Sequence, residues 1–164
     1  MKLIAGTGTI LAIASLLQLS RIADEGPRVI GPIETIIEVH SNIPFLARVD
    51  TGATTCSMHF ESLQIRNAAV DPQDNVGKRI RFLVKNRKGQ STWIESDIAG
   101  APKVQTSEDA EQRYMVWLTL RCREVEKRVL VTLNDRTDMT YPLLIGRNFL
   151  RDDFVVDVGM VSKH

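Results

Sequence analysis

Three separate stretches of this sequence alternate apolar and polar residues with a period of two. Residues 79–85 place three apolar side chains on one face of an extended chain and three basic side chains on the other. Residues 114–120 and 129–133 alternate in the same way. A period of two is typical of a strand with one buried face. Only residues 57–65 and 146–152 could hold a turn of helix or a short helix, so we predict a mainly β fold.

Further strands are predicted on either side of residues 79–85. Residues 35–40 and 45–49 are β-rich and are separated by a short polar turn containing proline, which predicts a hairpin. Residues 86–89, Asn-Arg-Lys-Gly, have the composition of a turn and lead into a strand at residues 91–96. Residues 99–112 show no periodicity and are expected to form a loop.

The N-terminus predicts export. Residues 3–19 contain no charged side chain and lie between Lys2 and Arg21, as in a secretory signal or a membrane anchor. As a helix they would extend about 25 Å, slightly less than the roughly 30 Å hydrocarbon core of a bilayer. We therefore expect residues 1–20 to be a signal peptide or an N-terminal anchor, residues 21–28 a linker, and residues 29–164 the folded domain. The alternative is a buried N-terminal helix.

Length and composition exclude some classes of function. A chain of 164 residues suits one domain. Its formal net charge is only +1 and aromatic residues make up 5%, so nothing points to nucleic acid as a partner. The two cysteines match no disulfide framework or zinc ribbon.

The strongest candidate for chemistry is Asp50. An apolar strand, residues 45–49, delivers this carboxylate into the small-residue turn Thr51-Gly52-Ala53. Glycine allows the chain to approach the carboxylate closely. The structural alternative is an Asx turn, in which Asp50 only binds backbone amides two residues on.

A second segment, residues 141–150, is an apolar strand that ends at Gly146-Arg147-Asn148 and enters a predicted helix. Together with Asp-Thr-Gly-Ala it resembles the retropepsin-like aspartic peptidases. The resemblance is greatest to the bacterial branch often labelled ATP-dependent zinc proteases. It implies a closed β barrel, the half of an acid protease, with one short helix after the Gly-Arg-Asn segment. The chain has neither His-Glu-x-x-His nor a phosphate-binding loop motif, so we expect no metal and no cofactor.

The resemblance also assigns roles to the residues of both segments. Asp50 would be catalytic, Thr51 would hold two active-site loops together, and Gly52 and Ala53 would line the substrate cleft. The supporting residues behind the loop would be Gly146, Arg147 and Asn148. Aspartic peptidases need two carboxylates that share a proton, and this chain has one Asp-Thr-Gly. We therefore predict an aspartic endopeptidase that acts on peptide or protein substrates as a homodimer.

The family pattern leaves several points open. Retroviral members carry an acid four residues after the catalytic Asp, which pairs with the Arg of Gly-Arg-Asn, but this position is Thr54 here. The partner of Arg147 is therefore open. The flap that closes the cleft could be residues 99–112 or the turn at residues 86–89. Residues 154–158 could be a strand at the dimer interface or an internal strand of the barrel.

Two other functions are weighed against the peptidase. The same barrel could bind a peptide or serve as a dimerisation module without catalysis. A zinc hydrolase is less favoured and would draw its ligands from Cys56, His59 and Cys122.

Overall fold

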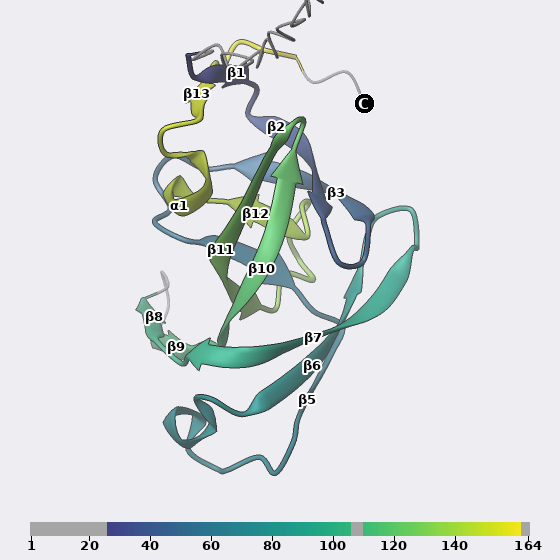
Figure 1. Ribbon diagram of the computed structural model, residues 1–164, viewed down its shortest axis with the longest axis vertical. Coiled ribbons are helices and arrows are strands. Elements are labelled where there is room, and N and C mark those ends of the chain that lie inside the picture. Colours follow the sequence, from purple (N-terminus) through teal and green to yellow (C-terminus); the bar gives the residue numbers. More distant parts are fainter. Residues whose placement is uncertain (1–25, 106–109, 162–164) are drawn as a thin grey trace, which may run out of the picture.

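The structure is a computed structural model that describes residues 26–105 and 110–161. It confirms the mainly β prediction (Figure 1). The strands are β1 Arg28–Ile30, β2 Ile33–Glu38, β3 Ile43–Val49, β4 Cys56–His59, β5 Ser62–Ile65, β6 Arg79–Lys85, β7 Ser91–Gly100, β8 Lys103–Gln105, β9 Ala110–Gln112, β10 Met115–Cys122, β11 Val125–Asn134, β12 Leu143–Ile145 and β13 Phe154–Val156. The helices are the 3-10 helix η1 Pro72–Asn75 and the α-helix α1 Arg147–Leu150.

Six strands close into a barrel. Their order is β11, β4, β12, β3, β2 and β10, and pairing of β10 with β11 completes the ring. Alternate side chains of these strands fill the barrel interior, because every second residue of a barrel strand points inward. Buried examples are Phe45, Met58, Leu120, Val131 and Leu143. The closed barrel and a short α-helix after Gly146 confirm the predicted fold class.

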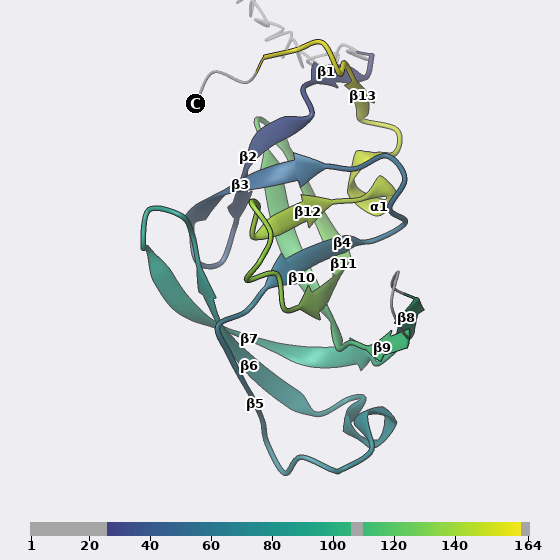
Figure 2. The same ribbon diagram turned by 180° about the vertical axis from the view of Figure 1, so that it is seen from behind.

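A second layer of strands continues from β10. Strands β7, β6 and β5 extend the sheet below the barrel (Figure 2). The prediction for residues 79–85 is confirmed: Ile80, Phe82 and Val84 are buried, while Arg79 and Arg81 are exposed. Strand β7 runs to Gly100, beyond the predicted end at residue 96.

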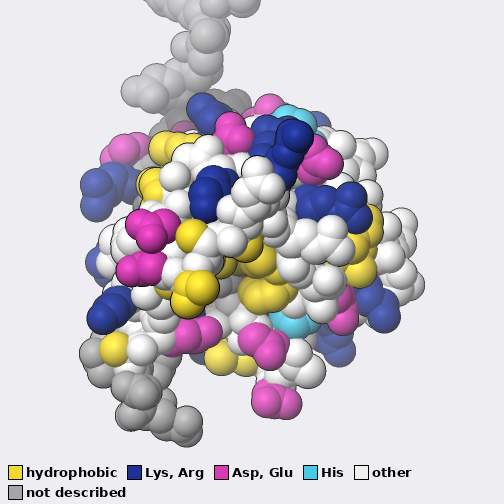
Figure 3. Space-filling model, turned by 90° about the horizontal axis from the view of Figure 1, so that it is seen from below, with side chains coloured by type: hydrophobic (Ala, Val, Ile, Leu, Met, Phe, Trp, Pro, Cys, Tyr) yellow, Lys and Arg dark blue, Asp and Glu magenta, His cyan; other side chains and the backbone are white. Residues whose placement is uncertain are grey.

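Seen from below, the molecule carries apolar side chains near the centre of this face, surrounded by charged side chains of both signs (Figure 3). On β6 and β7, the exposed Arg79 lies 3.4 Å from both Glu95 and Asp97. Positive and negative groups are therefore interspersed on these strands.

Two predictions of local structure were wrong. Residues 57–65 form β4 and β5, not a helical turn. Strand β4 pairs with β11 on one side and β12 on the other, so tertiary pairing decides its conformation. Residues 99–112 contain the end of β7 and the β8–β9 hairpin rather than a plain loop. Backbone pairing forms this hairpin without an alternating pattern of side chains.

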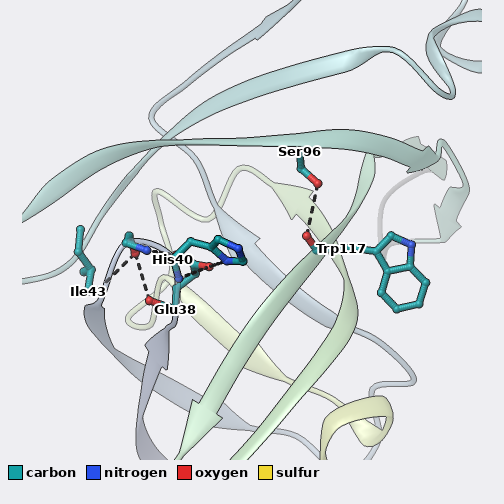
Figure 4. Close-up of polar contacts among 6 residues, drawn as sticks. Glu38, His40, Ile43, Ser96 and Trp117 are labelled. Atoms are coloured by element: carbon teal, nitrogen blue, oxygen red, sulfur yellow. Dashed lines mark hydrogen bonds and ion pairs between the residues drawn. The ribbon is translucent and has the colours of Figure 1, made fainter.

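The β2–β3 hairpin is confirmed, with residues 39–42 as its turn. Glu38 is fully buried, and its carboxylate accepts hydrogen bonds from the backbone N–H groups of His40 at 3.3 Å and Ser41 at 2.7 Å (Figure 4). The same figure shows the Ser96 hydroxyl donating to the Trp117 carbonyl, a contact between β7 and β10. Because the turn fixes the register of the hairpin, it also fixes which residue stands at the far end of β3.

The first and last strands of the described residues form a separate sheet. Strand β13 pairs in parallel with β1, and Val155 lies opposite Val29. Residues 154–156 are therefore not an internal barrel strand. The last residue of the predicted linker, Arg28, is the first residue of β1. The predicted signal or anchor, residues 1–20, lies outside the described residues. Within the part that is described, no helix has the length and apolarity needed to cross a membrane.

Candidate active site

Asp50 stands immediately after β3, at the barrel rim. β3 lies between β2 and β12, and its own register is therefore fixed on both sides. The Asp50 N–H donates to the Ile145 carbonyl at 2.9 Å, which extends the β3–β12 pairing by one residue. The end of an apolar strand thus holds a half-buried carboxylate at a fixed position.

The loop after Asp50 orients its carboxylate. Oδ1 accepts hydrogen bonds from the N–H groups of Gly52 at 2.8 Å and Ala53 at 3.2 Å. In the described part of the chain, Oδ2 has no hydrogen-bond partner. One oxygen is therefore fixed by the backbone and the other remains available to a water molecule, a substrate or a second carboxylate.

Gly146 lies behind this loop and touches its backbone. A Cβ atom built on Gly146 would lie 2.6 Å from the carbonyl carbon of Thr55 and 2.7 Å from its oxygen. The Gly146 backbone has a φ of −98°, which any residue adopts. The position requires glycine for steric reasons alone, because the clash is with main chain that cannot rotate away.

Arg147 makes contact with the Asp50 loop from the first position of α1. Its guanidinium donates to the carbonyls of Thr51 at 3.2 Å and Gly52 at 2.9 Å, and to the Thr54 hydroxyl at 3.0 Å. The open question of its partner is thus answered: a hydroxyl stands where retroviral members have an acid. The backbone is tied in parallel, since the Arg147 N–H donates to the Ala53 carbonyl at 2.9 Å.

Asn148 links the segment to the barrel. Its Oδ1 accepts from the Cys56 N–H at 3.0 Å, and its Nδ2 donates to the Leu130 carbonyl at 2.8 Å. These bonds connect α1 with β4 and β11. All three residues of the Gly146-Arg147-Asn148 segment therefore contact the chain between Thr51 and Cys56, which leads from the Asp50 turn into β4.

The Arg147 contacts allow a test of loop support. Replacing Arg147 by Met removes three hydrogen bonds while keeping most of the side-chain volume, and we expect the free energy of unfolding to fall by about 1 to 2 kcal/mol. Thr54→Val, which removes only one of the three, should have a smaller effect. Urea denaturation of both variants measures the difference. Equal stability of Arg147→Met and the wild type would show that these bonds do not support the loop.

The Cys56 side chain contacts the Gly146-Arg147-Asn148 segment, a role that sequence reasoning missed. The Cys56 thiol donates to Asn148 Oδ1 at 3.2 Å and its sulfur accepts from the Gly146 N–H at 3.4 Å. Burial raises the pKa of Cys56 to about 11, and burial likewise raises the pKa of Cys122 to about 11. Both are free thiols. Only the spacing of Cys56 after Asp50 could have suggested its contact with Asn148.

The zinc alternative requires Cys56, His59 and Cys122 to converge. Across residues 26–105 and 110–161, no three His, Cys, Asp or Glu side chains are grouped so that they could hold a metal ion. His59 instead accepts a hydrogen bond at Nδ1 from the Arg136 N–H, at 3.0 Å. The donor set of this alternative is therefore not assembled in the described structure.

A cleft of about 790 Å³ lies between the β6–β7 turn and residues 136–142. Its charged lining residues are His59, Glu61, Lys85, Arg87, Lys88 and Arg136. Sequence reasoning missed Arg136, since its surroundings in the sequence carry no motif. The turn itself is held at the start of β3, because Asn86 Nδ2 donates to the Pro44 carbonyl at 2.9 Å. Asp50 follows the opposite end of β3, so this flap candidate does not contact the Asp50 loop in the structure.

Comparisons with known proteins agree with this architecture. Residues 29–162 match the model of a family described as RimB-like, retropepsin-like aspartic endopeptidase RimB. A solved structure of a protein of unknown function from Legionella pneumophila subsp. pneumophila strain Philadelphia 1 is similar with a TM-score of 0.65. The two are 24% identical, and the similarity covers 81% of this chain and 95% of that one, which shows a shared fold. A search of curated proteins found no match.

Proposed function

This chain belongs to the RimB-like family of retropepsin-like aspartic endopeptidases, and from that membership we propose that it hydrolyses peptide bonds with an activated water molecule. The water lies between two Asp50 carboxylates, one from each subunit of a homodimer. The observation that carries the proposal is the fixed Asp50 carboxylate, with one oxygen bound by the Gly52 and Ala53 N–H groups.

The chemistry follows from placing two such carboxylates together. Two like charges about 3 Å apart cannot both ionise, so the pair retains one proton. The ionised carboxylate takes a proton from the water, and the protonated one polarises the scissile carbonyl. No covalent intermediate forms. Thr51 contacts the partner's loop, and Gly52 and Ala53 line the cleft in which the peptide lies.

A surface on the described chain suits a second copy. Val29 and Val155 are opposite each other in the β1–β13 sheet, and each is about half exposed. An exposed pair of β-branched residues on a two-stranded sheet is a surface that association would bury. We place the dimer contact at this sheet. A contact at this sheet would bring the two Asp50 loops close together. The reason is that α1 contacts the Asp50 loop and lies only a few residues before β13 in the chain.

A cleavage assay on the full chain tests the proposal. A mixed peptide library is incubated with the protein between about pH 4 and 8, with and without EDTA, and the products are identified by mass spectrometry. Cleavage that EDTA does not inhibit supports the aspartic mechanism. Binding of peptides without cleavage at any pH would support the non-catalytic module, and loss of cleavage with EDTA would support a metal-dependent site.

Dilution should lower the activity of each subunit. Below the dissociation constant of the dimer, every monomer holds one carboxylate, and no pair can share a proton. Specific activity is measured across a dilution series, in parallel with the mass of the protein by light scattering. A monomer whose specific activity does not depend on concentration would refute the shared pair.

We also propose that residues 3–19 direct the chain out of the bacterial cytoplasm, to the periplasm or the inner membrane. The basis is the uncharged run in the sequence. Cell fractionation of the full chain, compared with a variant in which Leu11 and Leu16 are replaced by Arg, tests this directly.

A further inference from the structure

A buried arginine lines the cleft between the β6–β7 turn and residues 136–142. Arg136 lies in the loop that follows β11, and only 7% of its surface is exposed. Its guanidinium keeps its charge at every physiological pH. Charged side chains are almost never buried to this degree unless an opposite charge compensates them. A group that compensates Arg136 is therefore expected in or beside the cleft.

The contacts of Arg136 do not supply that group. Its Nε donates to the Tyr141 carbonyl at 3.1 Å, which is a neutral acceptor. Among the residues that the structure describes, no carboxylate forms an ion pair with the guanidinium, and its two terminal nitrogens have no hydrogen-bond partner. The adjacent Asp135 and the cleft residue Glu61 lie beside His59 instead, at 3.6 and 3.9 Å. Two NH2 groups of a buried cation are therefore available to a ligand.

The cleft carries more positive than negative side chains. Besides Arg136 it is lined by Lys85, Arg87 and Lys88, which are all exposed. Against these four cations, the described lining residues include one carboxylate, that of Glu61. A concave site lined by charges of one sign concentrates ligands of the opposite sign. The cleft of about 790 Å³ thus favours an anion.

Asn86 holds the turn that carries two of these cations. Its Oδ1 accepts hydrogen bonds from the N–H groups of Lys88 and Gln90, each at 3.0 Å. Its Nδ2 donates to the Pro44 carbonyl at 2.9 Å, which ties the turn to the start of β3. The Asn86 side chain that makes these bonds is itself buried. The fold therefore fixes the backbone at Arg87 and Lys88 before a ligand binds.

The loop that carries Arg136 is also held by the barrel. The Arg136 N–H donates to His59 Nδ1 at 3.0 Å, and the Met139 N–H donates to the Arg136 carbonyl at 2.9 Å. The His59 N–H in turn donates to the Pro142 carbonyl at 2.7 Å. Both walls of the cleft are thus preformed, which lowers the entropic cost of binding a ligand between them.

We propose that this cleft binds a phosphate group and that the Arg136 guanidinium is its principal contact. The planar fork of a guanidinium matches two oxygens of a phosphate. A phosphate monoester carries about 1.5 to 2 negative charges at pH 7 and three acceptor oxygens. It therefore balances the excess of cations more fully than a single carboxylate does, and Lys85, Arg87 and Lys88 can reach the oxygens that Arg136 leaves free.

This inference goes beyond the proposed function. The cleft residues belong neither to the Asp50 turn nor to the Gly146-Arg147-Asn148 segment. Its test is a binding measurement, so a wild-type protein that cleaves no peptide would refute the proposed function and leave this inference standing.

Calorimetric titration of the full chain tests the site with three phosphate probes: inorganic phosphate, pyrophosphate and a phosphoserine peptide. Malonate is the comparison, because it offers two carboxylates in a molecule about as small as pyrophosphate. The ionic strength is kept constant, since salt screens the exposed cations. Binding of inorganic phosphate or pyrophosphate would support a small phosphorylated ligand, and binding of the phosphopeptide alone would support a phosphate carried by a protein.

The variants separate the buried cation from the exposed ones. We expect Arg136→Met to weaken binding of the phosphate probe by at least about ten-fold, because it removes a charge-assisted bidentate contact. The double variant Arg87→Gln/Lys88→Gln should weaken it by about two- to five-fold, as exposed charges contribute less. Arg66→Gln is the matched control, because it removes an exposed positive charge after β5, outside the cleft. It should leave the affinity unchanged.

Four results would overturn the inference: no binding of any phosphate probe, equal affinity for malonate, unchanged affinity in folded Arg136→Met, or an equal loss in Arg66→Gln. If Arg136→Met does not fold, the double variant decides, because both of its substitutions are at exposed positions of the turn. Unchanged affinity in the double variant would then refute the phosphate site.

Discussion

Replacing Asp50 by Asn is expected to abolish peptide cleavage, with a loss of at least about a thousand-fold in kcat. Asn is nearly isosteric with Asp, and its side-chain oxygen can still accept from the Gly52 and Ala53 N–H groups, so the fold and the dimer should persist. What is lost is the group that takes the proton from water. In a symmetric dimer the substitution removes both carboxylates at once.

The measurement is the initial rate of cleavage by wild-type and Asp50→Asn protein at equal concentration, with circular dichroism to show that both are folded. Asp97→Asn is a suitable control, because Asp97 is exposed on β7 and lies beside Arg79 rather than in the candidate site. Retained cleavage by pure Asp50→Asn protein would exclude the aspartic mechanism.

Replacing Gly146 by Val should lower stability and activity together. The added Cβ would lie 2.6 Å from the Thr55 carbonyl carbon and 3.0 Å from its nitrogen. These are backbone atoms, so the strain is relieved only if the main chain moves. We expect a loss of about 3 kcal/mol in the free energy of unfolding. Because Thr55 follows the Asp50 loop, the same displacement would disturb the carboxylate.

A matched pair of alanine variants isolates the steric cause. Gly146→Ala adds only the clashing Cβ, whereas the Cβ of Gly100→Ala meets nothing closer than the Pro102 Cδ at 3.9 Å. We expect the first to be strongly destabilised and the second to keep its melting temperature within a few degrees. Thermal unfolding gives both values. An unchanged melting temperature for Gly146→Val would show that the loop has room that the structure does not show.

Periodicity predicted strands where one face of the strand is buried and the other is exposed. Strand β6 is such a case, and its alternating residues were sufficient. Strand β4 is buried at three of its four residues, so its sequence carries no alternation and its conformation follows from pairing on both sides. The sequence of the β8–β9 hairpin has no apolar face that would predict its strands. In the described structure, these two strands pair with each other.

In the candidate site, too, some features follow from the local sequence and others from tertiary contacts. The sequence by itself determined the Asp50 turn, the Gly146-Arg147-Asn148 segment and the family, because each depends on residues adjacent along the chain. Only the tertiary structure decided that Arg147 binds Thr54 and that Cys56 lies against Asn148. The physical reason is that hydrogen bonds act through space, between residues that closure of the barrel brings together from positions about 90 apart in the chain.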